Sequence, residues 1–308
     1  MEKKIIGFSL NFDWLSSVVE VDDIENLENI DRFLCEETDE LLNYITDKGG
    51  RVSIFVVGKD LMRPIIAKYI KKWFEDGHEI GNHSWSHPVN FGELSQSEIK
   101  EEIFKTEQII LKTINKKSEG FISPSWSSSI LTFKTLLNND FTYDHSIMPS
   151  IQNIFLRLMM ALKSKKRKES ITKIISWRLL LFSIRQPTKP YVLLSEEKKM
   201  IQVPLPTIFK LFSYWYTPDL LLSFYSRYRT LFLKKIGSHV VFHPADYCSF
   251  DQISNYKDLF PQSNIELGER KKVIKNYIDT LYENNYQIIT MKRLVSSLNE
   301  IKLKNLKI

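Results

Sequence analysis

Short apolar runs alternate along this chain with segments in which apolar residues recur at helical spacing. The runs IIGFSL (residues 5–10) and RVSIFVVG (51–58) have the length and composition of buried strands, and the second ends in glycine. Between them, LCEETDELLNYITDKGG (34–50) has the spacing of a helix and a glycine stop. These segments predict a β-α-β unit with two parallel strands.

The same alternation continues for most of the remaining chain. Helices are expected over 61–75 and 95–115. Further short strands are expected at HEIG (78–81), GFIS (120–123), FTYD (141–144), MIQVP (200–204), SHVVFH (238–243) and YQIIT (286–290), with helices on both sides of the last. Repeated alternation predicts an α/β fold with a mostly parallel sheet, either a barrel or doubly wound.

One stretch departs from this pattern. Residues 151–190 are interpreted as two amphipathic helices around a basic cluster, inserted into a single domain that spans 1–308. The cluster consists of Lys163, Lys165, Lys166, Arg167 and Lys168. Two interpretations stay open: a hairpin packed on the domain with a solvated basic turn, or a surface that docks an anionic membrane or an anionic glycan.

Composition and charge narrow the class of protein. With 308 residues, 43% of them hydrophobic, the chain can bury the core of one elaborated α/β domain. The formal charge of +6 suits an anionic partner, but no basic motif of a nucleic-acid-binding protein is present, so no nucleic-acid partner is expected.

Several features predict a cytoplasmic protein, peripheral at the membrane if the basic segment docks there. The first apolar run breaks at Asn11 and Asp13, short of the roughly 7 to 15 apolar residues of a signal peptide. Cys35 and Cys248 form neither a metal motif nor a disulfide framework. No segment approaches the roughly 18 uninterrupted apolar residues of a membrane-spanning helix.

Two histidines in GHEIGNHSWSHP are candidate metal ligands. His83 and His87 are four residues apart, so a helical turn would place both imidazoles on one face, at a separation that suits one metal ion. Such a pair can also be two ordinary hydrogen-bonded histidines. The pair follows a predicted strand, where α/β folds place their sites, which favours the metal.

Two more strand ends carry candidate functional groups. Asp13 follows the first strand and could be a third ligand, since a divalent cation satisfies a carboxylate and two imidazoles together; the alternative is a helix cap or a surface acid. His243 ends the strand SHVVFH and precedes a proline. It is either a core histidine or a proton shuttle, and the other candidates favour the shuttle.

These motifs resemble those of the NodB-homology polysaccharide deacetylases, which are carbohydrate esterase family 4-like, metal-dependent N-deacetylases. The matching segments are FVVG (55–58), GHEIGNHSWSHP (77–88), GFISPSW (120–126), FTYDHSIM (141–148) and VVFHP (240–244). The resemblance runs from Ile5 to about Leu298 apart from the insertion. It implies a distorted (β/α) barrel, to which the sequence pattern adds the helical insertion.

The resemblance implies a metal centre at Asp13, His83 and His87, with zinc as the expected divalent ion. Such an ion polarises a substrate carbonyl and lowers the pKa of water. The backbone N–H of Ser125, which follows Pro124, would help to hold the developing oxyanion.

Proton transfer and substrate contact complete the implied site. His243 would protonate the departing amine, with Asp144 or Asp246 as an orienting carboxylate. From their residue type, Trp85 and Trp126 are candidates to contact the sugar, and the alternative is that they pack in the core or on the surface. Three further aromatic residues that could stack on the sugar are Tyr214, Trp215 and Tyr216.

The chain departs from the family pattern at its first motif, Asn11-Phe12-Asp13-Trp14. If Asp13 is the ligand, Asn11 stands where the family has its base; if Asp13 is the base, Trp14 replaces the ligand. Ile122 occupies the position of the arginine that holds the base in the family. An arginine without its carboxylate would be an unpaired buried charge, so Asn11 and Ile122 are consistent with each other and favour the first alignment. The base is then expected to be His243.

The expected function is a metal-dependent hydrolase that removes an N-acetyl group from an amino sugar in a glycan or glycan precursor. Two alternatives remain. One is an allantoinase-like C–N hydrolase of a small cyclic amide or ureide, which the N-[FY]-[DE] form of the first motif also resembles. The other is a non-catalytic carbohydrate-binding protein on the same fold.

Overall fold

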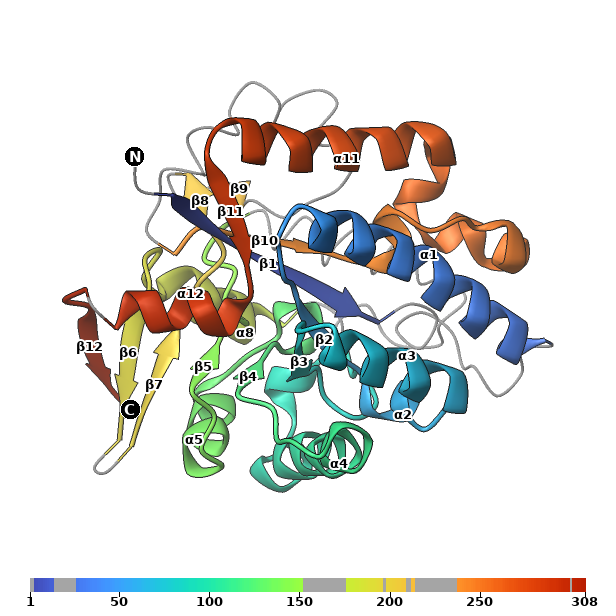
Figure 1. The fold of residues 1–308 in the computed structure, drawn as a ribbon. Helices are drawn as coiled ribbons and strands as arrows, with labels where there is room; N and C mark the ends of the chain where they lie inside the picture. The colour runs from blue at the N-terminus through green and yellow to red at the C-terminus, as the bar shows by residue number, and fades with distance from the viewer. Residues whose placement is uncertain are drawn as a thin grey trace.

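A mostly parallel sheet forms the centre of the molecule in the computed structural model (Figure 1), which describes residues 3–13, 26–151, 176–195, 198–208, 212–213, 237–299 and 301–308. Ten strands make up this sheet: β1 (Lys4–Phe12), β2 (Ser53–Val56), β3 (Glu79–Asn82), β4 (Gly120–Phe121), β5 (Tyr143–Asp144), β6 (Tyr191–Leu194), β7 (Lys199–Gln202), β10 (His239–Phe242), β11 (Tyr286–Ile289) and β12 (Lys304–Lys307). Their order is β10-β1-β2-β3-β4-β5-β7-β6-β12, and β11 also pairs with β1. All neighbours are parallel except β6 and β7.

Helices surround the sheet and connect its strands (Figure 1). They are α1 (Leu27–Asp47), α2 (Gly58–Leu61), α3 (Pro64–Glu75), α4 (Gln96–Ile114), α5 (Ile130–Asn138), α8 (Trp177–Arg185), α11 (Leu267–Glu283) and α12 (Met291–Leu298). Short 3-10 turns cover Phe91–Glu93, Pro124–Trp126, Pro244–Asp246, Asp251–Leu259 and Pro261–Asn264. A small antiparallel pair consists of β8 (Thr207–Ile208) and β9 (Phe212–Ser213).

Strand β1 lies inside the sheet and is buried on both faces over most of its length. Its even-numbered apolar residues belong to one hydrophobic core with α1, α3 and α11: Ile6, Phe8, Leu10 and Phe12. Because successive side chains of a strand point to opposite faces, Gly7, Ser9 and Asn11 share the other face. A side chain at Gly7 would collide with Met291 and Leu294 of α12, so glycine permits α12 to pack closely there.

Local signals determine where the long helices start. Ser95 caps α4 in a capping box with Glu98, and Ser129 caps α5 in one with Thr132. Helix α3 begins at Pro64, where the missing N–H costs no hydrogen bond. The described ranges contain no helix that combines the length and the apolar character needed to cross a bilayer.

The structure confirms the predicted α/β class, with several differences in detail. The expected strands at 120–123 and 141–144 are only two residues long, and helix α5 and strands β6 and β12 were not expected from the sequence. Helix α8 falls within the predicted insertion at 151–190, whereas 152–175, with the whole basic cluster, lie outside the described residues. The predicted single domain and its insertion therefore stay predictions.

Candidate active site

The carboxyl ends of β1, β2, β3 and β10 meet at one edge of the sheet. Phe12 pairs with Val56, and Val56 pairs with Asn82, so the residues that follow these strands, Asp13 and His83 among them, leave the sheet at the same level. Strand β10 is the neighbour of β1 on its other side. Leu10 pairs there with Phe242, which places the next residues, Asn11 and His243, side by side. Strand register alone therefore gathers the sequence candidates.

Asp13, His83 and His87 form a compact cluster of potential metal ligands. One ligand atom from each lies within 4.8 Å of the others, and the described residues contain no second group of this kind. Asp13 Oδ2 lies 3.2 Å from His87 Nε2 and 3.7 Å from His83 Nε2. Both histidines are buried, at 1% and 7% exposure.

The hydrogen bonds and protonation of this cluster fit a divalent cation. His83 Nδ1 lies 2.7 Å from the carbonyl oxygen of Ile122, which fixes the proton on Nδ1 and leaves the Nε2 lone pair free. His83 Nε2 and both ring nitrogens of His87 are buried without a hydrogen-bond partner. Burial would raise the pKa of Asp13, but His243, His83 and His87 outweigh it and hold the pKa well below its usual value. An ionised carboxylate and neutral imidazoles are the species that ligate zinc.

The segment from His83 to His87 is a loop, so the expected helical turn is wrong. Ser84 and His87 have φ values of 64° and 54°, in the left-handed region that β-carbon sterics disfavour. Asn82 Oδ1 accepts the N–H of Ser84 at 2.9 Å, and Ser84 Oγ accepts the N–H of His87 at 3.2 Å. The two imidazole rings still meet, edge to face with centroids 4.8 Å apart.

Glu102 of α4 holds the middle of this loop. Its Oε2 accepts the backbone N–H groups of Trp85 and Ser86, each at 2.9 Å, and its Oε1 accepts the Ser86 hydroxyl at 2.7 Å. The loop has no regular secondary structure, so these bonds satisfy amides that would otherwise lack partners. Glu102 therefore stabilises the left-handed backbone that presents His87.

His243 stands beside the metal-ligand cluster. Its Nε2 lies 3.5 Å from Asn11 Nδ2 and 4.0 Å from Asp13 Oδ2. On the other side of the ring, Nδ1 lies 3.8 Å from Oδ2 of Asp246, which also accepts the backbone N–H of His243 at 2.8 Å. Burial would lower the pKa of His243, but Asp13 and Asp246 outweigh it and raise the pKa. Gln262 Nε2 binds the other oxygen of Asp246 at 2.8 Å and fixes that carboxylate.

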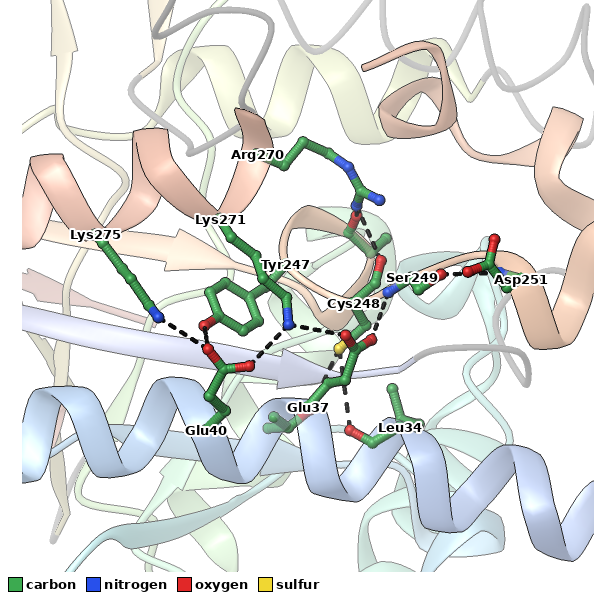
Figure 2. A network of polar contacts seen from close by, with 12 residues as sticks. Leu34, Glu37, Glu40, Tyr247, Cys248, Ser249, Asp251, Arg270, Lys271 and Lys275 are labelled. Atoms are coloured by element: carbon green, nitrogen blue, oxygen red, sulfur yellow. Dashed lines mark hydrogen bonds and ion pairs between the residues drawn. The ribbon is translucent and has the colours of Figure 1, made fainter. Parts of the chain in front are cut away.

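The segment that follows His243 is braced by α1 and α11 (Figure 2). Arg270 is only 2% exposed, and its Nη1 donates to the carbonyl oxygens of Ala245 and Cys248 at 2.7 and 3.0 Å. The other polar contacts of this network involve Glu37, Glu40, Tyr247, Ser249, Lys271 and Lys275. The turn that carries His243 and Asp246 is therefore anchored to two helices.

Asp144 takes a different position from the one proposed for it as an orienting carboxylate. It is fully buried and bonds the hydroxyl and the N–H of Ser146, whose Oγ accepts the N–H of Ser123 at 2.7 Å. In the part of the chain that the structure describes, no hydrogen bond or ion pair joins Asp144 to Asp13 or His243. Burial raises the pKa of Asp144 to about 7, against the opposing hydrogen bonds of Ser146. Of the two candidate orienting carboxylates, only Asp246 contacts His243.

The segment Pro124–Trp126 lies next to His243. Pro124 is buried, and Ser125 and Trp126 have left-handed φ values of 52° and 50°. The Trp126 ring meets the His243 ring edge to face, with centroids 6.2 Å apart. Left-handed non-glycine residues cost of order 1–3 kcal/mol each and cluster at functional sites. Trp126 is therefore placed to contact a substrate that reaches His243.

Other aromatic candidates are placed differently. The partly buried Trp85 ring packs over Gly58, where an added β-carbon would lie 2.5 Å from the indole. Trp85 thus packs the loop of residues 83–87 against Gly58, which follows β2. Only the exposed part of its ring could contact a sugar. Residues 214–216 and Trp14 lie outside the described residues.

Sequence reasoning missed several residues that hold the site. The Ile122 carbonyl, Glu102, Gln262 and Arg270 each act through contacts with residues distant in the chain. Glu102 carries no motif and resembles any acid of a solvated helix. Arg270 stands out by its burial, at 2% exposure, which a sequence does not reveal.

Comparison with known proteins agrees with the motifs. Residues 22–150 match the family model described as polysaccharide deacetylase. This range contains His83 and His87, but it begins after Asp13 and ends before His243. The matched part of the chain thus includes two of the three candidate ligands.

Curated relatives align with shorter parts of the chain. A peptidoglycan deacetylase of Helicobacter pylori is 30% identical over 82 residues, which are 27% of this chain and 28% of the relative. A peptidoglycan-N-acetylglucosamine deacetylase of Bacillus cereus is 29% identical over 91 residues, which are 30% of this chain and 32% of the relative. The chain therefore spans less than a third of the length of these curated relatives.

Solved structures match over nearly the whole chain. A candidate polysaccharide deacetylase from Mycobacterium smegmatis has a TM-score of 0.65 at 14% identity and covers 100% of this chain and 94% of its own. A CE4 family pseudoenzyme from Bacillus anthracis has a TM-score of 0.52 at 16% identity and covers 99% of this chain and 68% of its own. A mutant of that pseudoenzyme, with restored enzymatic activity, also has a TM-score of 0.52.

These likenesses concern the fold, and they confirm the distorted (β/α) barrel of the NodB-homology type. The order of motifs, the family model and the shared fold agree with one another. Residues 22–150 therefore resemble the polysaccharide deacetylase family, and the chain shares the fold of the solved structures named above.

Proposed function

We propose that the protein is a metal-dependent hydrolase that removes the N-acetyl group from an amino sugar in a glycan or glycan precursor. One observation carries this proposal: the cluster of Asp13, His83 and His87 has a histidine beside it, His243, whose Nε2 lies 4.0 Å from Asp13 Oδ2. A Lewis-acid site and a group that can transfer a proton are the two parts that amide hydrolysis requires.

The relatives support this substrate class. By their names, one of the curated relatives is a peptidoglycan deacetylase and the other a peptidoglycan-N-acetylglucosamine deacetylase. A small cyclic ureide finds no such support among them. Because the chain aligns with less than a third of each relative, the substrate remains part of the proposal.

Asp13, His83 and His87 would hold the ion, and zinc suits this mixed set of nitrogen and oxygen ligands. When bound, the ion polarises the acetyl carbonyl and makes water more acidic. The chain contributes the orientation of its ligands: the Ile122 carbonyl aims His83, and Glu102 holds the loop of His87.

His243 would move the proton in both halves of the reaction. Its Nε2 takes a proton from water as the water oxygen bonds to the acetyl carbon. The same proton passes to the amide nitrogen as the C–N bond breaks, so that acetic acid and a free amine leave. Asp246 faces Nδ1 at 3.8 Å, which favours the tautomer with the proton on Nδ1 and the lone pair on Nε2.

Asn11 favours a second candidate function, carbohydrate binding without catalysis. An amide side chain cannot accept a proton at neutral pH, and Asn11 occupies the interior face of β1 beside His243. A pseudoenzyme shares the fold, although at 16% identity. Binding without turnover is therefore the alternative outcome of the activity test.

The test measures amine release from N-acetylglucosamine oligosaccharides by protein loaded with Zn²⁺. We expect turnover by the natural protein and by Glu101→Ala, a change of an exposed acid on α4, and a loss of at least about 10²-fold in His243→Ala. No release by the natural protein, together with saturable binding of the same oligosaccharides, would replace the proposal with the binding function. Release that survives His243→Ala would show that another group moves the proton.

We also propose a cytoplasmic location. Its support is that Cys35 and Cys248 are free thiols, both buried, as expected of a protein from a reducing compartment. Cell fractionation with an antibody against the chain tests this, and recovery in an extracytoplasmic fraction would contradict it.

A further inference from the structure

We infer that α8 carries a docking surface for an anionic phospholipid membrane. Four residues of one side of this helix define the surface, called here the α8 face: Trp177, Arg178, Leu181 and Arg185. The inference goes beyond the proposed function and does not depend on it, because docking is measured without substrate.

The opposite side of α8 packs firmly on the domain. Leu179, Leu180 and Ser183 are buried, and the Ser183 hydroxyl donates to the carbonyl oxygen of Met148 at 2.8 Å. Phe182 meets Phe133 of α5 with ring centroids 5.6 Å apart. The helix is therefore held in place by contacts that the α8 face does not supply.

The α8 face leaves large apolar side chains in solvent. Trp177 is 63% exposed and Leu181 is 49% exposed, and the two lie one helical turn apart. Most of the Trp177 ring remains in water in the folded protein, which gives up the stabilisation that burial would provide. At a membrane surface the ring of a tryptophan sits among the lipid head groups. The α8 face therefore exposes apolar side chains on a helix whose other side is packed against the domain.

Basic residues flank these apolar side chains. Arg178 and Arg185 are both exposed, and neither forms a hydrogen bond or ion pair with another described residue. Each lies three or four residues from Leu181, so the charges and the apolar groups share one side of the helix. Guanidinium groups in this position can bind lipid phosphates while Trp177 and Leu181 reach past them.

Charge along the chain supports a lipid partner. The segment 151–190 contains ten of the 43 Lys and Arg residues and one of the 37 Asp and Glu residues, a net charge of +9. The remaining chain therefore has 33 basic and 36 acidic residues, a net charge of −3. The entire basic excess of the protein lies in the segment that includes α8. Each Lys or Arg near an anionic leaflet contributes about 1 kcal/mol.

The buried side of α8 is linked to the segment Pro124–Trp126 of the candidate site. Gly92 touches Leu179 of α8, since an added β-carbon would lie 2.9 Å from Leu179 Cδ2, and its N–H donates to Ser127 Oγ at 3.0 Å. Ser127 directly follows Trp126. Docking through α8 would thus hold the segment Pro124–Trp126 close to the membrane.

The experiment measures co-sedimentation of the full chain with vesicles of phosphatidylcholine alone and with one quarter phosphatidylglycerol. We expect binding only to the anionic vesicles, and weaker binding as salt increases. Arg178→Ser with Arg185→Ser should reduce the affinity about 10-fold or more, because two basic contacts are lost. Trp177→Ser with Leu181→Ser should reduce binding at high salt as well, because it removes the apolar contact.

Matched control variants separate docking through α8 from nonspecific binding to vesicles. Phe104→Ser removes a side chain that is 52% exposed on α4, and Lys112→Ser with Lys116→Ser removes two exposed charges at and just after the end of this helix. Neither should change vesicle binding. Changing Lys165, Lys166, Arg167 and Lys168 to Ser should remove much of the salt-sensitive part of vesicle binding.

A second readout does not rely on the serine variants folding. Brominated lipids should quench Trp177 in vesicle-bound protein, and the quenching should disappear in Trp177→Phe. Equal vesicle binding by the natural protein and both α8 variants would overturn the inference. So would binding to a soluble polyanion such as heparin without any binding to anionic vesicles.

Discussion

Asn11 stands where the polysaccharide deacetylases that this chain resembles have their base. It occupies the inner face of β1, and its amide nitrogen lies 3.5 Å from His243 Nε2. Ile122, which stands where those deacetylases have an arginine, is fully buried and carries no charge that could hold a carboxylate at position 11. Asn11 therefore contacts His243, the residue proposed to transfer the proton, and its amide cannot itself accept a proton at neutral pH.

Substitutions of Asn11 should separate these roles. Asn11→Ala should cost little turnover, whereas His243→Ala should cost nearly all of it. Asn11→Asp should gain less than about 10-fold alone, and up to about 10²-fold with Ile122→Arg, since a positioned base contributes about that much. Rates of amine release on N-acetylglucosamine oligosaccharides give the comparison. If Asn11→Ala is as inactive as His243→Ala, the single-histidine account is wrong.

Asp246 should set the pH at which His243 works. The carboxylate favours the charged imidazolium, so removing it in Asp246→Asn should lower the pKa of His243. If His243 acts first as a base, activity rises with pH through this pKa, and the acidic limb of the kcat/KM profile should shift to lower pH. Lys275→Ser, a change in the exposed network of α11, should leave the limb in place. An unchanged acidic limb in Asp246→Asn would remove the orienting role.

At the scale of elements, the site depends on a loop that α4 holds from outside. Glu102 accepts three hydrogen bonds from Trp85 and Ser86, and this keeps the left-handed backbone at His87. Residues that support metal ligands typically change metal affinity 10- to 100-fold when altered. The loop and the helix are thus one functional unit.

Glu102→Ala should therefore weaken Zn²⁺ binding by about 10- to 100-fold, and Glu102→Gln by less, because glutamine keeps one acceptor. Zn²⁺ titration of metal-free protein measures both. The neighbouring Glu101 contacts only Lys105 among the described residues, at 2.5 Å, so Glu101→Ala is the control. Equal Zn²⁺ affinity in Glu102→Ala and Glu101→Ala would show that the loop holds its own shape.

Strands that are buried on both faces could be predicted from the sequence, and the exposed strand β12 could not. The apolar runs of β1 and β10 correctly located the strand ends that carry Asp13 and His243. Strand β12 has the sequence KNLK, which suits an edge strand but has no apolar signature. The four-residue spacing of His83 and His87 predicted a helical turn, but the structure has a loop with left-handed residues there. Glu102 holds this loop, and the spacing of the histidines does not reveal that contact.

For the whole molecule, buried carboxyl groups couple stability to pH. Asp144 is fully buried, and burial raises its pKa to about 7 from 3.8 in the unfolded chain. A raised carboxyl pKa stabilises the folded state below pH 3.8, and this stabilisation is lost as pH rises through about 7. At alkaline pH the buried Asp144 is ionised, which lowers the free energy of unfolding.

Asp144→Asn removes this titration while keeping a polar side chain beside Ser146. Between pH 4 and pH 8, the free energy of unfolding of the variant should rise relative to the natural protein, by at most roughly 4 kcal/mol. Urea unfolding at several pH values measures the difference. Parallel pH profiles for the two proteins would contradict the assigned shift.

The central claim is that Asp13, His83 and His87 bind one divalent ion, and elemental analysis after Zn²⁺ loading and dialysis tests it most directly. We expect about one ion per chain in the natural protein and in His243→Ala, which keeps all three ligands. His83→Ala and His87→Ala should stay folded, because their side chains lie beyond the strand ends, and should lose the ion. Full occupancy in either ligand variant, or no ion in the natural protein, would contradict the account.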